Sequence, residues 1–385
     1  MAQLPYGAFA TAADRSVRLG VAVDEHVLDL RLLSERGRVP DPEGTLRATT
    51  LNPFMAEGRA RWQEVRTALD GLTVEDVGDA AVSLADVTLH LPFAVADYAD
   101  FYSSLHHATN VGRMFRPDSE PLLPNWRHVP VAYHGRAGTV VVSGTDVVRP
   151  CGQWLPPGAD APTFGPSTRL DVEVEVGFVV GVPSEHGRTV PASAFADHVF
   201  GVVLVNDWSA RDLQAWEYQP LGPFLGKSFA TSVSAWVTPL DALAAARVPP
   251  PAQDPPPLPH LRDDDPWGLD LRLELVVNGT VVSRPPFRET YWTPGQQLAH
   301  MTSNGASLRT GDLYASGTVS GAADDERGSL LELTWHGRDP ITLADGSIRT
   351  FLEDGDVVTI RGTAPDGQGG AVILGEVTGR VLPAR

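Results

Sequence analysis

Leu170-Asp171-Val172-Glu173-Val174-Glu175-Val176-Gly177-Phe178 is the stretch with the clearest periodic pattern in this chain of 385 residues. Aliphatic residues alternate with acidic ones, and the side chains of a β-strand point alternately to its two faces. The pattern therefore predicts a strand with one face in a core and with Asp171, Glu173 and Glu175 on the other face. Like charges on one strand face repel each other. A divalent cation held by Glu173 and Glu175 would relieve that repulsion, whereas the alternative is an ordinary solvated face; the stretch alone leaves both open.

The sequence on either side of this stretch predicts more strands than helices. Residues 16–30 and 269–283 are typical of hairpins, the second with Asn278-Gly279 as a type I′ turn. Helices are expected to be short, as over residues 294–301 and in the segment that begins at Asn52-Pro53, where Asn52 is the expected cap. The composition changes after Pro92, where aromatic residues, glycine and proline become more frequent. We therefore expect a β-rich α+β protein with domains at residues 1–92 and 93–385.

The composition excludes several classes of protein. The 48 acidic and 30 basic residues give a formal charge of −18, which repels phosphate backbones and makes a nucleic-acid partner a poor expectation. The single cysteine, Cys151, cannot form an internal disulfide and indicates a reducing compartment. No apolar run approaches the length of a membrane span, and the first residues lack the pattern of a signal peptide. A cytoplasmic protein that does not associate with membranes is expected.

The stretch from Asp100 to Arg116 contains many kinds of polar group within seventeen residues, which suggests a site. It holds a carboxylate, a phenol, hydroxyls, two imidazoles and guanidinium groups. His107 follows Asp100 by two helical turns, so both could face one cavity if the stretch is helical. His134 is a rival to His107, and the spacing of residues does not choose between them.

Further candidates come later in the chain. Asp207 ends an apolar strand, where it is either a third carboxylate ligand or the cap of a following helical turn. Lys227 lies among apolar residues and needs a carboxylate partner or a site. Glu332 is read as a single acid within an apolar strand, and paired with a histidine it would orient a general base. Residues 316–321 form a small-residue loop that would let the backbone approach a ligand.

Six motifs in the chain together resemble the fumarylacetoacetase (fumarylacetoacetate hydrolase) family, in the family's order. They are DFYSSLHHATNVGRMFR (100–116), PNWRHVPVAYHGRAGTVVVSG (124–144), LDVEVEVGF (170–178), NDWSARDLQAWEYQPLGPFLGKSFATS (206–232), GDLYASGTVSG (311–321) and GSLLELTW (328–335). The resemblance implies a small N-terminal SH3-like barrel, a C-terminal mixed β-roll and a homodimer. It also implies hydrolysis of a carbon–carbon bond in 4-fumarylacetoacetate, a dicarboxylate diketone, to fumarate and acetoacetate in tyrosine and phenylalanine catabolism.

The resemblance also implies a role for individual residues. For calcium, the matching ligands are Asp100, Glu173, Glu175 and Asp207; for a neighbouring magnesium site they are Asp207, Lys227 and Thr231, with a backbone oxygen serving at Lys227. His107 matches the catalytic base and Glu332 the acid that orients it. The matching substrate contacts are Tyr102, Arg116, Tyr133, Gln214, Tyr218 and Thr318. Arg211, Gln214 and Lys227 match the family residues that stabilise the oxyanion and the leaving carbanion.

Two departures from the family pattern bear on the site. Ala230 stands where the family usually has glycine, beside the magnesium ligands, and Leu105-His106 replaces a more usual polar pair before His107. Two other functions are kept as alternatives. One is an acylpyruvate or other β-diketone hydrolase of the same fold, and the other is a non-catalytic β protein in which a cation only stabilises the fold.

Overall fold

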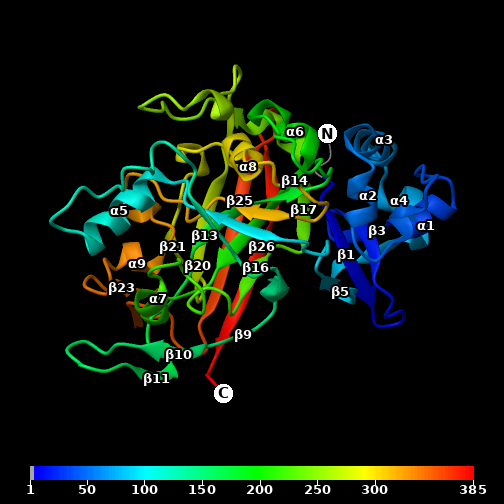
Figure 1. Cartoon of the computed structure of the whole chain (residues 1–385). Coiled ribbons are helices and arrows are strands. Elements are labelled where there is room, and N and C mark those ends of the chain that lie inside the picture. The colour runs from blue at the N-terminus through cyan, green and yellow to red at the C-terminus, as the bar shows by residue number, and fades with distance from the viewer. Residues whose placement is uncertain (1–3) are drawn as a thin grey trace.

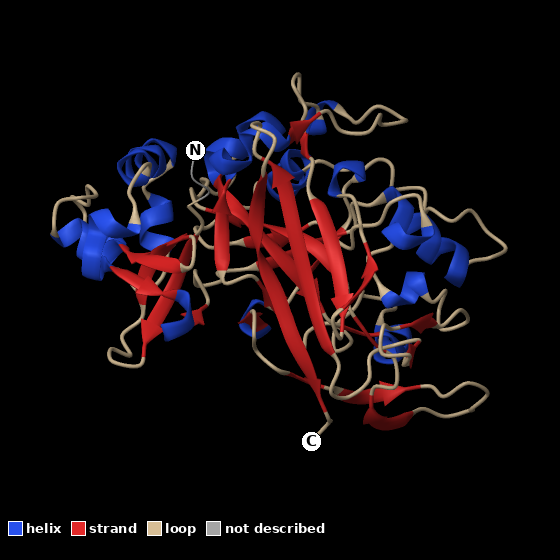
Figure 2. Ribbon diagram, turned by 180° about the vertical axis from the view of Figure 1, so that it is seen from behind, coloured by secondary structure: helices blue, strands red, loops and turns tan. Residues whose placement is uncertain are grey.

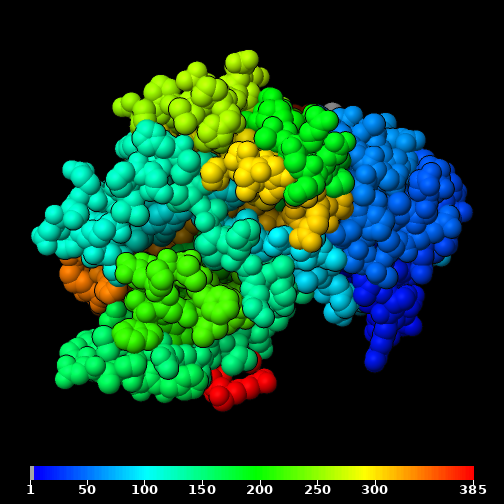
Figure 3. Space-filling view, in the orientation of Figure 1, coloured from blue at the N-terminus to red at the C-terminus, as the bar shows by residue number. Residues whose placement is uncertain are grey.

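The protein is described by a computed structural model that covers residues 4–385. Its first three residues, where the predicted N-terminal domain begins, lie outside this range. In Figure 1 the N-terminal strands and helices, in blue, form a lobe at one side, and β25 and β26 run through the middle of the remainder. In the space-filling view, the lower part of this blue lobe is separated from the rest of the molecule (Figure 3). Within residues 4–385, none of the helices has the length and apolar character that a membrane span requires.

A 13-stranded sheet runs through both parts of the chain. Its main path, in spatial order, is β4 (Ala81–Ser83), β3 (His26–Asp29), β2 (Arg18–Val23), β1 (Tyr6–Thr11), β17 (Trp236–Pro239), β14 (Val199–Asp207), β13 (Val174–Val180), β22 (Leu313–Ala315), β6 (Tyr98–Phe101) and β7 (Ala132–His134). Off this path, β5 (Val87–His90) pairs with β1, and β16 (Thr231–Val233) pairs with β14 and with β8 (Val140–Val142). The pairing of Tyr6 with Val237 joins the N-terminal strands to the later ones.

A second sheet of five strands packs against the first. Its order is β21 (Thr280–Ser283), β20 (Arg272–Val277), β25 (Val357–Pro365), β26 (Ala371–Leu382) and β9 (Val147–Val148). The remaining strands form two-stranded pairs: β10 (Cys151–Trp154) with β11 (Thr163–Pro166), β12 (Leu170–Asp171) with β15 (Ser209–Ala210), β18 (Arg247–Val248) with β19 (Gly268–Leu269), and β23 (Ile341–Thr342) with β24 (Ile348–Arg349).

Helices are short and lie around the edges of the strands (Figure 2). They are α1 (Leu30–Glu35), α2 (Asn52–Ala56), α3 (Arg59–Leu69), α4 (Val74–Val77), α5 (Leu105–Phe115), α6 (Phe195–His198), α7 (Arg211–Glu217), α8 (Pro294–Thr302) and α9 (Leu330–Leu333). The predicted β-rich α+β class is thus confirmed. The strands of residues 6–90 show no pairing that closes them into a barrel within residues 4–385, so the SH3-like barrel stays a prediction.

Most local predictions match the structure. Both predicted hairpins form, and Asn278 and Gly279 have the positive φ angles, 48° and 78°, of a type I′ turn. The prediction for Asn52 is wrong, since its side chain bonds the backbone of Ala94 instead of capping α2. That bond ties the start of α2 to the segment that leads into β6.

The strand β13 is covered on both of its faces. Val174, Val176 and Phe178 lie in a core cluster with residues of β20, β25 and β26, whereas Val179 lies in a second cluster with the N-terminal strands. The acidic residues that alternate with the valines therefore face the interior of the protein. A solvated strand face, the alternative considered for this stretch, is excluded, because Glu175 is fully buried and Glu173 nearly so.

We predict that Leu204→Ala in β14 lowers the free energy of unfolding by about 2–5 kcal/mol, because a fully buried leucine side chain would be replaced by a cavity. The matched control is Leu258→Ala, since Leu258 is 57% exposed and its truncation should change stability by less than about 0.5 kcal/mol. Chemical denaturation of both variants measures the difference. Equal stabilities would contradict the placement of Leu204 in the core.

Candidate active site

Four carboxylates from neighbouring segments converge at one place in the large sheet. Asp100 lies in β6, Glu173 just before β13, Glu175 in β13 and Asp207 at the end of β14. The strand register brings Asp100 close to Glu175. Ala315 of β22 pairs with Asp100 on one side and, on the other side, with Gly177, which follows Glu175 by two residues. One oxygen of each carboxylate lies within 4.8 Å of the others, and all four side chains are buried. We call these four residues the acidic cluster.

Two basic side chains partly neutralise the acidic cluster. The ammonium of Lys227 donates to Asp207 Oδ2 at 2.5 Å and also contacts Glu173. The guanidinium of Arg211, at the start of α7, places Nη2 2.8 Å from Glu173 Oε1. Burial alone would raise the pKa of Glu173, but the charges of Lys227 and Arg211 hold it well below its ordinary value. Glu173 is therefore ionised.

Asp100 and Glu175 lack such a basic partner among residues 4–385. Asp100 Oδ1 and both oxygens of Glu175 are buried and have no hydrogen-bond partner within residues 4–385. Burial, together with the neighbouring acids, raises the pKa of Asp100 and of Glu175 well above the ordinary values. Buried, unpartnered carboxylate oxygens are the ligands that hard divalent cations prefer. The acidic cluster therefore fits a divalent cation.

Asp207 has the contacts expected of a residue shared between sites. It accepts hydrogen bonds from the Tyr133 hydroxyl at 2.9 Å and from the Thr231 hydroxyl at 3.4 Å, besides that from Lys227. The cap alternative for Asp207 is wrong, since α7 begins at Arg211 and its cap position is Ala210. A cavity of about 100 Å³ lies beside these groups, lined among others by Tyr98, Tyr133, Asp207, Lys227 and Thr231. Because the Lys227 ammonium is a donor, only its backbone oxygen could serve a second cation here.

His107 and Glu332 form a buried pair close to the acidic cluster. The Nδ1 of His107, in the first turn of α5, lies 2.6 Å from Glu332 Oε2. Three further groups donate to this carboxylate: the Asn110 amide at 3.0 Å and the hydroxyls of Ser320 at 2.9 Å and Ser329 at 3.0 Å. Burial alone would raise the pKa of Glu332, but His107 and these donors lower it below its ordinary value. An ionised Glu332 directs the Nδ1 proton of His107 toward itself and leaves Nε2 as the basic atom. The rival, His134, is exposed in β7.

Glu332 does not lie in a strand, as the sequence suggested, but in the helical turn α9. Ser329 caps this turn by accepting a hydrogen bond from the Glu332 backbone at 3.3 Å. The spacing Ser329-x-x-Glu332 is a capping-box pattern that marks a helix start, and it was the available signal for this turn. The cap matters for the site because the Ser329 hydroxyl also donates to the Glu332 carboxylate.

The expected substrate-contact residues differ in how near they lie to His107 and to the acidic cluster. Tyr102 stands edge-on to His107, with 5.1 Å between ring centroids, and Tyr133 lies against Asp207. Thr318 is buried, and its hydroxyl has no hydrogen-bond partner among residues 4–385. It lies in a loop where Gly317 has a φ of 76° and a Cβ would collide with the Phe101 carbonyl. Of the other three, Gln214 accepts a hydrogen bond from Arg211, whereas Arg116 and Tyr218 are less central. Arg116 donates to the Pro121 carbonyl at 2.6 Å, and Tyr218 is 45% exposed at the end of α7.

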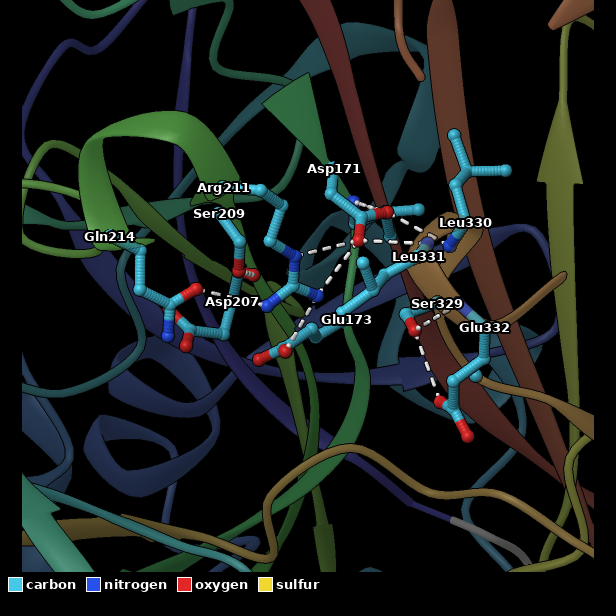
Figure 4. A network of polar contacts seen from close by, with 12 residues as sticks. Asp171, Glu173, Asp207, Ser209, Arg211, Gln214, Ser329, Leu330, Leu331 and Glu332 are labelled. Carbon is cyan, nitrogen blue, oxygen red and sulfur yellow. Dashed lines mark hydrogen bonds and ion pairs between the residues drawn. The ribbon is translucent and has the colours of Figure 1, made fainter. Parts of the chain in front are cut away.

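Figure 4 shows the polar contacts that surround Arg211. Its Nη1 donates to Gln214 at 3.2 Å, and its Nε donates to Asp171 at 2.8 Å. Sequence reasoning placed Asp171 on the same strand face as Glu173 but gave it no role. It also missed the three partners of Glu332 (Asn110, Ser320 and Ser329), for which only the spacing before Glu332 offered a signal.

Comparisons with known proteins cover nearly the whole chain. The family model described as "Fumarylacetoacetate (FAA) hydrolase C-terminal" matches residues 97–382, and that described as "Fumarylacetoacetase N-terminal" matches residues 2–92. Among curated relatives, the fumarylacetoacetases of Rattus norvegicus and Caenorhabditis elegans are each 47% identical to this chain, over 99% of its length and 95% and 96% of theirs. That of Arabidopsis thaliana is 44% identical over 99% of this chain and 95% of its own.

Solved structures share the fold at low sequence identity. A fumarylacetoacetate hydrolase from the psychrophilic Exiguobacterium antarcticum has a TM-score of 0.59 at 18% identity, covering 99% of this chain and 100% of its own. A maleylpyruvate hydrolase from Sphingobium sp., solved in complex with manganese(II) and pyruvate, has a TM-score of 0.55 at 16% identity with the same coverage. Identities this low establish the fold alone.

We predict that Ca²⁺ raises the melting temperature of metal-stripped protein and that the rise is larger at pH 7.5 than at pH 5.5. The raised pKa values of Asp100 and Glu175 mean that the metal-free folded protein holds protons that the unfolded chain has lost, so ionisation destabilises it as pH rises. Binding requires ionised carboxylates, so affinity increases with pH and protons are released. Calorimetry in buffers of different ionisation enthalpy measures that release.

Glu175→Gln should abolish most of the Ca²⁺-dependent rise in melting temperature, whereas the control Asp118→Asn, at an exposed residue, should retain it. A wild-type melting temperature that millimolar Ca²⁺ leaves unchanged would contradict the assignment of a cation to the acidic cluster.

Proposed function

Because this chain belongs to the fumarylacetoacetate hydrolase family, we propose that it hydrolyses the carbon–carbon bond of 4-fumarylacetoacetate to fumarate and acetoacetate. The observation that carries the proposal is the His107–Glu332 pair, 2.6 Å apart, beside an acidic cluster suited to a divalent cation. The match of residues 2–92 to the fumarylacetoacetase N-terminal model favours this substrate over acylpyruvates. The reaction is the last step of tyrosine and phenylalanine catabolism.

The base is His107. Its Nδ1 faces the ionised Glu332, so its Nε2 is free to take a proton from water as that water attacks the substrate carbonyl. Glu332 stabilises the imidazolium that forms, and its three other donors hold the carboxylate in place. Tyr102, which stands edge-on to the imidazole, would border the attacked carbonyl.

Attack by water produces a tetrahedral oxyanion, and collapse of that species expels acetoacetate as an enolate. Donors aimed at the oxyanion can each contribute about 3–4 kcal/mol. Arg211, Gln214 and Lys227 would supply this stabilisation and would accommodate the charge of the leaving group. A divalent cation held by Asp100, Glu173, Glu175 and Asp207 would supply Lewis acidity to the 1,3-dicarbonyl unit. Protonation of the enolate completes a reaction that consumes one water.

Substrate carboxylates require cationic or hydroxylic partners. We assign this role to Arg116, Tyr133, Tyr218 and Thr318, together with Tyr102 and Gln214. The Tyr133 hydroxyl donates to Asp207 of the acidic cluster, and Thr318 has a buried hydroxyl, which supports their assignment. Arg116 would have to exchange its bond to the Pro121 carbonyl for a substrate oxygen.

Further features are part of the same proposal. We infer that Ca²⁺ occupies the acidic cluster. We infer that Mg²⁺ binds beside it, at Asp207, Thr231 and a backbone oxygen of Lys227. We also infer that the enzyme acts in the cytoplasm as a homodimer. We also infer an SH3-like domain over residues 1–92 and a catalytic β-roll over residues 93–385. The family-model boundaries, at residues 92 and 97, support this division.

His107→Ala should lower kcat for fumarylacetoacetate by about 10²–10⁴-fold, because the general base is lost while the binding groups remain. Loss of substrate absorbance measures turnover, and equilibrium binding of product measures the retained affinity. The control is His106→Ala, since His106 is half-exposed and contacts Glu289 at 3.2 Å instead of Glu332. Wild-type turnover by His107→Ala would refute the assignment of the base.

Removal of divalent cations with a chelator should abolish the consumption of fumarylacetoacetate, and Ca²⁺ or Mg²⁺ should restore it. Acylpyruvates measured in parallel distinguish the related hydrolase activity. Full activity in metal-free protein would contradict the cation requirement. A cation-dependent melting temperature without consumption of any diketone would indicate a purely structural cluster.

A further inference from the structure

Asp171 is a buried carboxylate that no role in the proposed reaction uses. Its side chain is fully buried, and it is surrounded by donors on every side (Figure 4). Oδ1 accepts from the backbone N–H groups of Val172 and Leu330, each at 2.8 Å. Oδ2 accepts from the N–H of Leu331 at 3.1 Å and from Arg211 Nε at 2.8 Å, and Arg211 Nη2 lies 2.7 Å from it.

Only a carboxylate satisfies this set of neighbours. All of them are donors, and they are shared between both oxygens of Asp171, so each oxygen must accept. An asparagine at this position would direct its NH₂ group at donors in either orientation. If its oxygen faced Arg211, it would lose Val172 and Leu330, and in the reverse orientation it would lose Arg211 and Leu331.

The two groups that Asp171 joins belong to different parts of the site. The N–H groups of Leu330 and Leu331 begin α9, the turn that carries Glu332 and thus the partner of His107. Arg211 begins α7 and also contacts Glu173 and Gln214. The two turns are more than one hundred residues apart in the sequence, and the Asp171 carboxylate bonds them both directly.

We propose that Asp171 is a positioning residue that fixes Arg211 relative to the His107–Glu332 pair. It acts through those residues and touches no substrate. The inference rests on the proposed function, because it concerns the distance between the group that stabilises the oxyanion and the base that activates water. Misplacement of such groups by about 1 Å can cost about 10²-fold in rate.

Loss of Asp171 would release Arg211 without leaving its charge unpaired. Glu173 and Gln214 remain as partners, so the guanidinium would move toward them. The start of α9 would lose the acceptor for two N–H groups, although Ser329 would still cap the turn. The expected defect is therefore one of geometry within a folded site.

Asp171→Asn should lower kcat for fumarylacetoacetate by about 10²-fold while KM changes far less, because the substrate-binding groups stay in place. Rates are expressed per folded molecule, counted by Ca²⁺-binding stoichiometry. The matched control is Asp212→Asn, whose carboxylate accepts from Ser167, Thr168 and Leu213 and contacts neither Arg211 nor α9. The control should keep kcat near the wild-type value.

A second comparison separates positioning from a general structural role. In a Glu332→Gln background, where the base is already impaired, Asp171→Asn should reduce the residual rate by much less than it does alone. A full additional loss in that background, or a wild-type kcat for Asp171→Asn, would overturn the proposal. Absence of turnover in the wild type would instead refute the proposed function.

Should Asp171→Asn not fold, Arg211→Lys tests the same link from its other end. Lysine offers a point charge in place of a planar fork, so it cannot span Asp171 and Glu173 in the same way. The expected result is again a fall in kcat with little change in KM. A wild-type kcat for Arg211→Lys would overturn the proposal.

Discussion

The acidic cluster imposes the constraint on which the rest of the site depends, because four carboxylates are held away from water. Among residues 4–385, the basic side chains in ion pairs with them are Lys227 and Arg211. An isolated buried charge costs several kcal/mol unless it is paired. Lys227 and Arg211 are committed to Glu173, Asp207 and Asp171, so Asp100 and Glu175 depend on something else. A divalent cation would meet that need, and it would bring to the same place the Lewis acidity that the proposed cleavage of a 1,3-dicarbonyl compound requires.

The fold meets this constraint by covering both faces of β13. One face packs on the second sheet, and the other contributes Val179 to a core cluster with the N-terminal residues. Strands β14, β13, β22 and β6 then bring the acids together by register, and the short helices α5, α7 and α9 place His107, Arg211 and Glu332 beside them. In Figure 1 these helices lie on the side of the molecule away from the blue lobe.

Local sequence patterns predicted the hairpins and a strand within residues 170–178, because these follow from turn chemistry and alternation, although the structure divides that stretch into β12 and β13. These patterns marked Glu173, Glu175 and Asp207 as candidate ligands, whereas the set with Asp100 came from the family resemblance. They did not predict what depends on distant contacts. Glu332 was read as part of a strand because Leu330-Leu331-Glu332-Leu333 is apolar on both sides of the acid, and only its Ser329 cap marks it as a helical turn. Asp171 received no role because its partners, Arg211 and the start of α9, lie 40 and 159 residues away. The choice of His107 over His134 also came from the family resemblance, not from spacing.

The most direct test of the central claim is to locate the cation. Crystals of the protein soaked with Mn²⁺, examined by anomalous diffraction, should show a peak among the carboxylates of Asp100, Glu173, Glu175 and Asp207, with oxygen ligands at about 2.1–2.6 Å. Asp100 Oδ1 and both Glu175 oxygens have no hydrogen-bond partner among residues 4–385, so both side chains are expected to be ligands in that site. Well-ordered crystals with no peak at the acidic cluster, and with Asp100 and Glu175 in the same positions, would contradict this expectation.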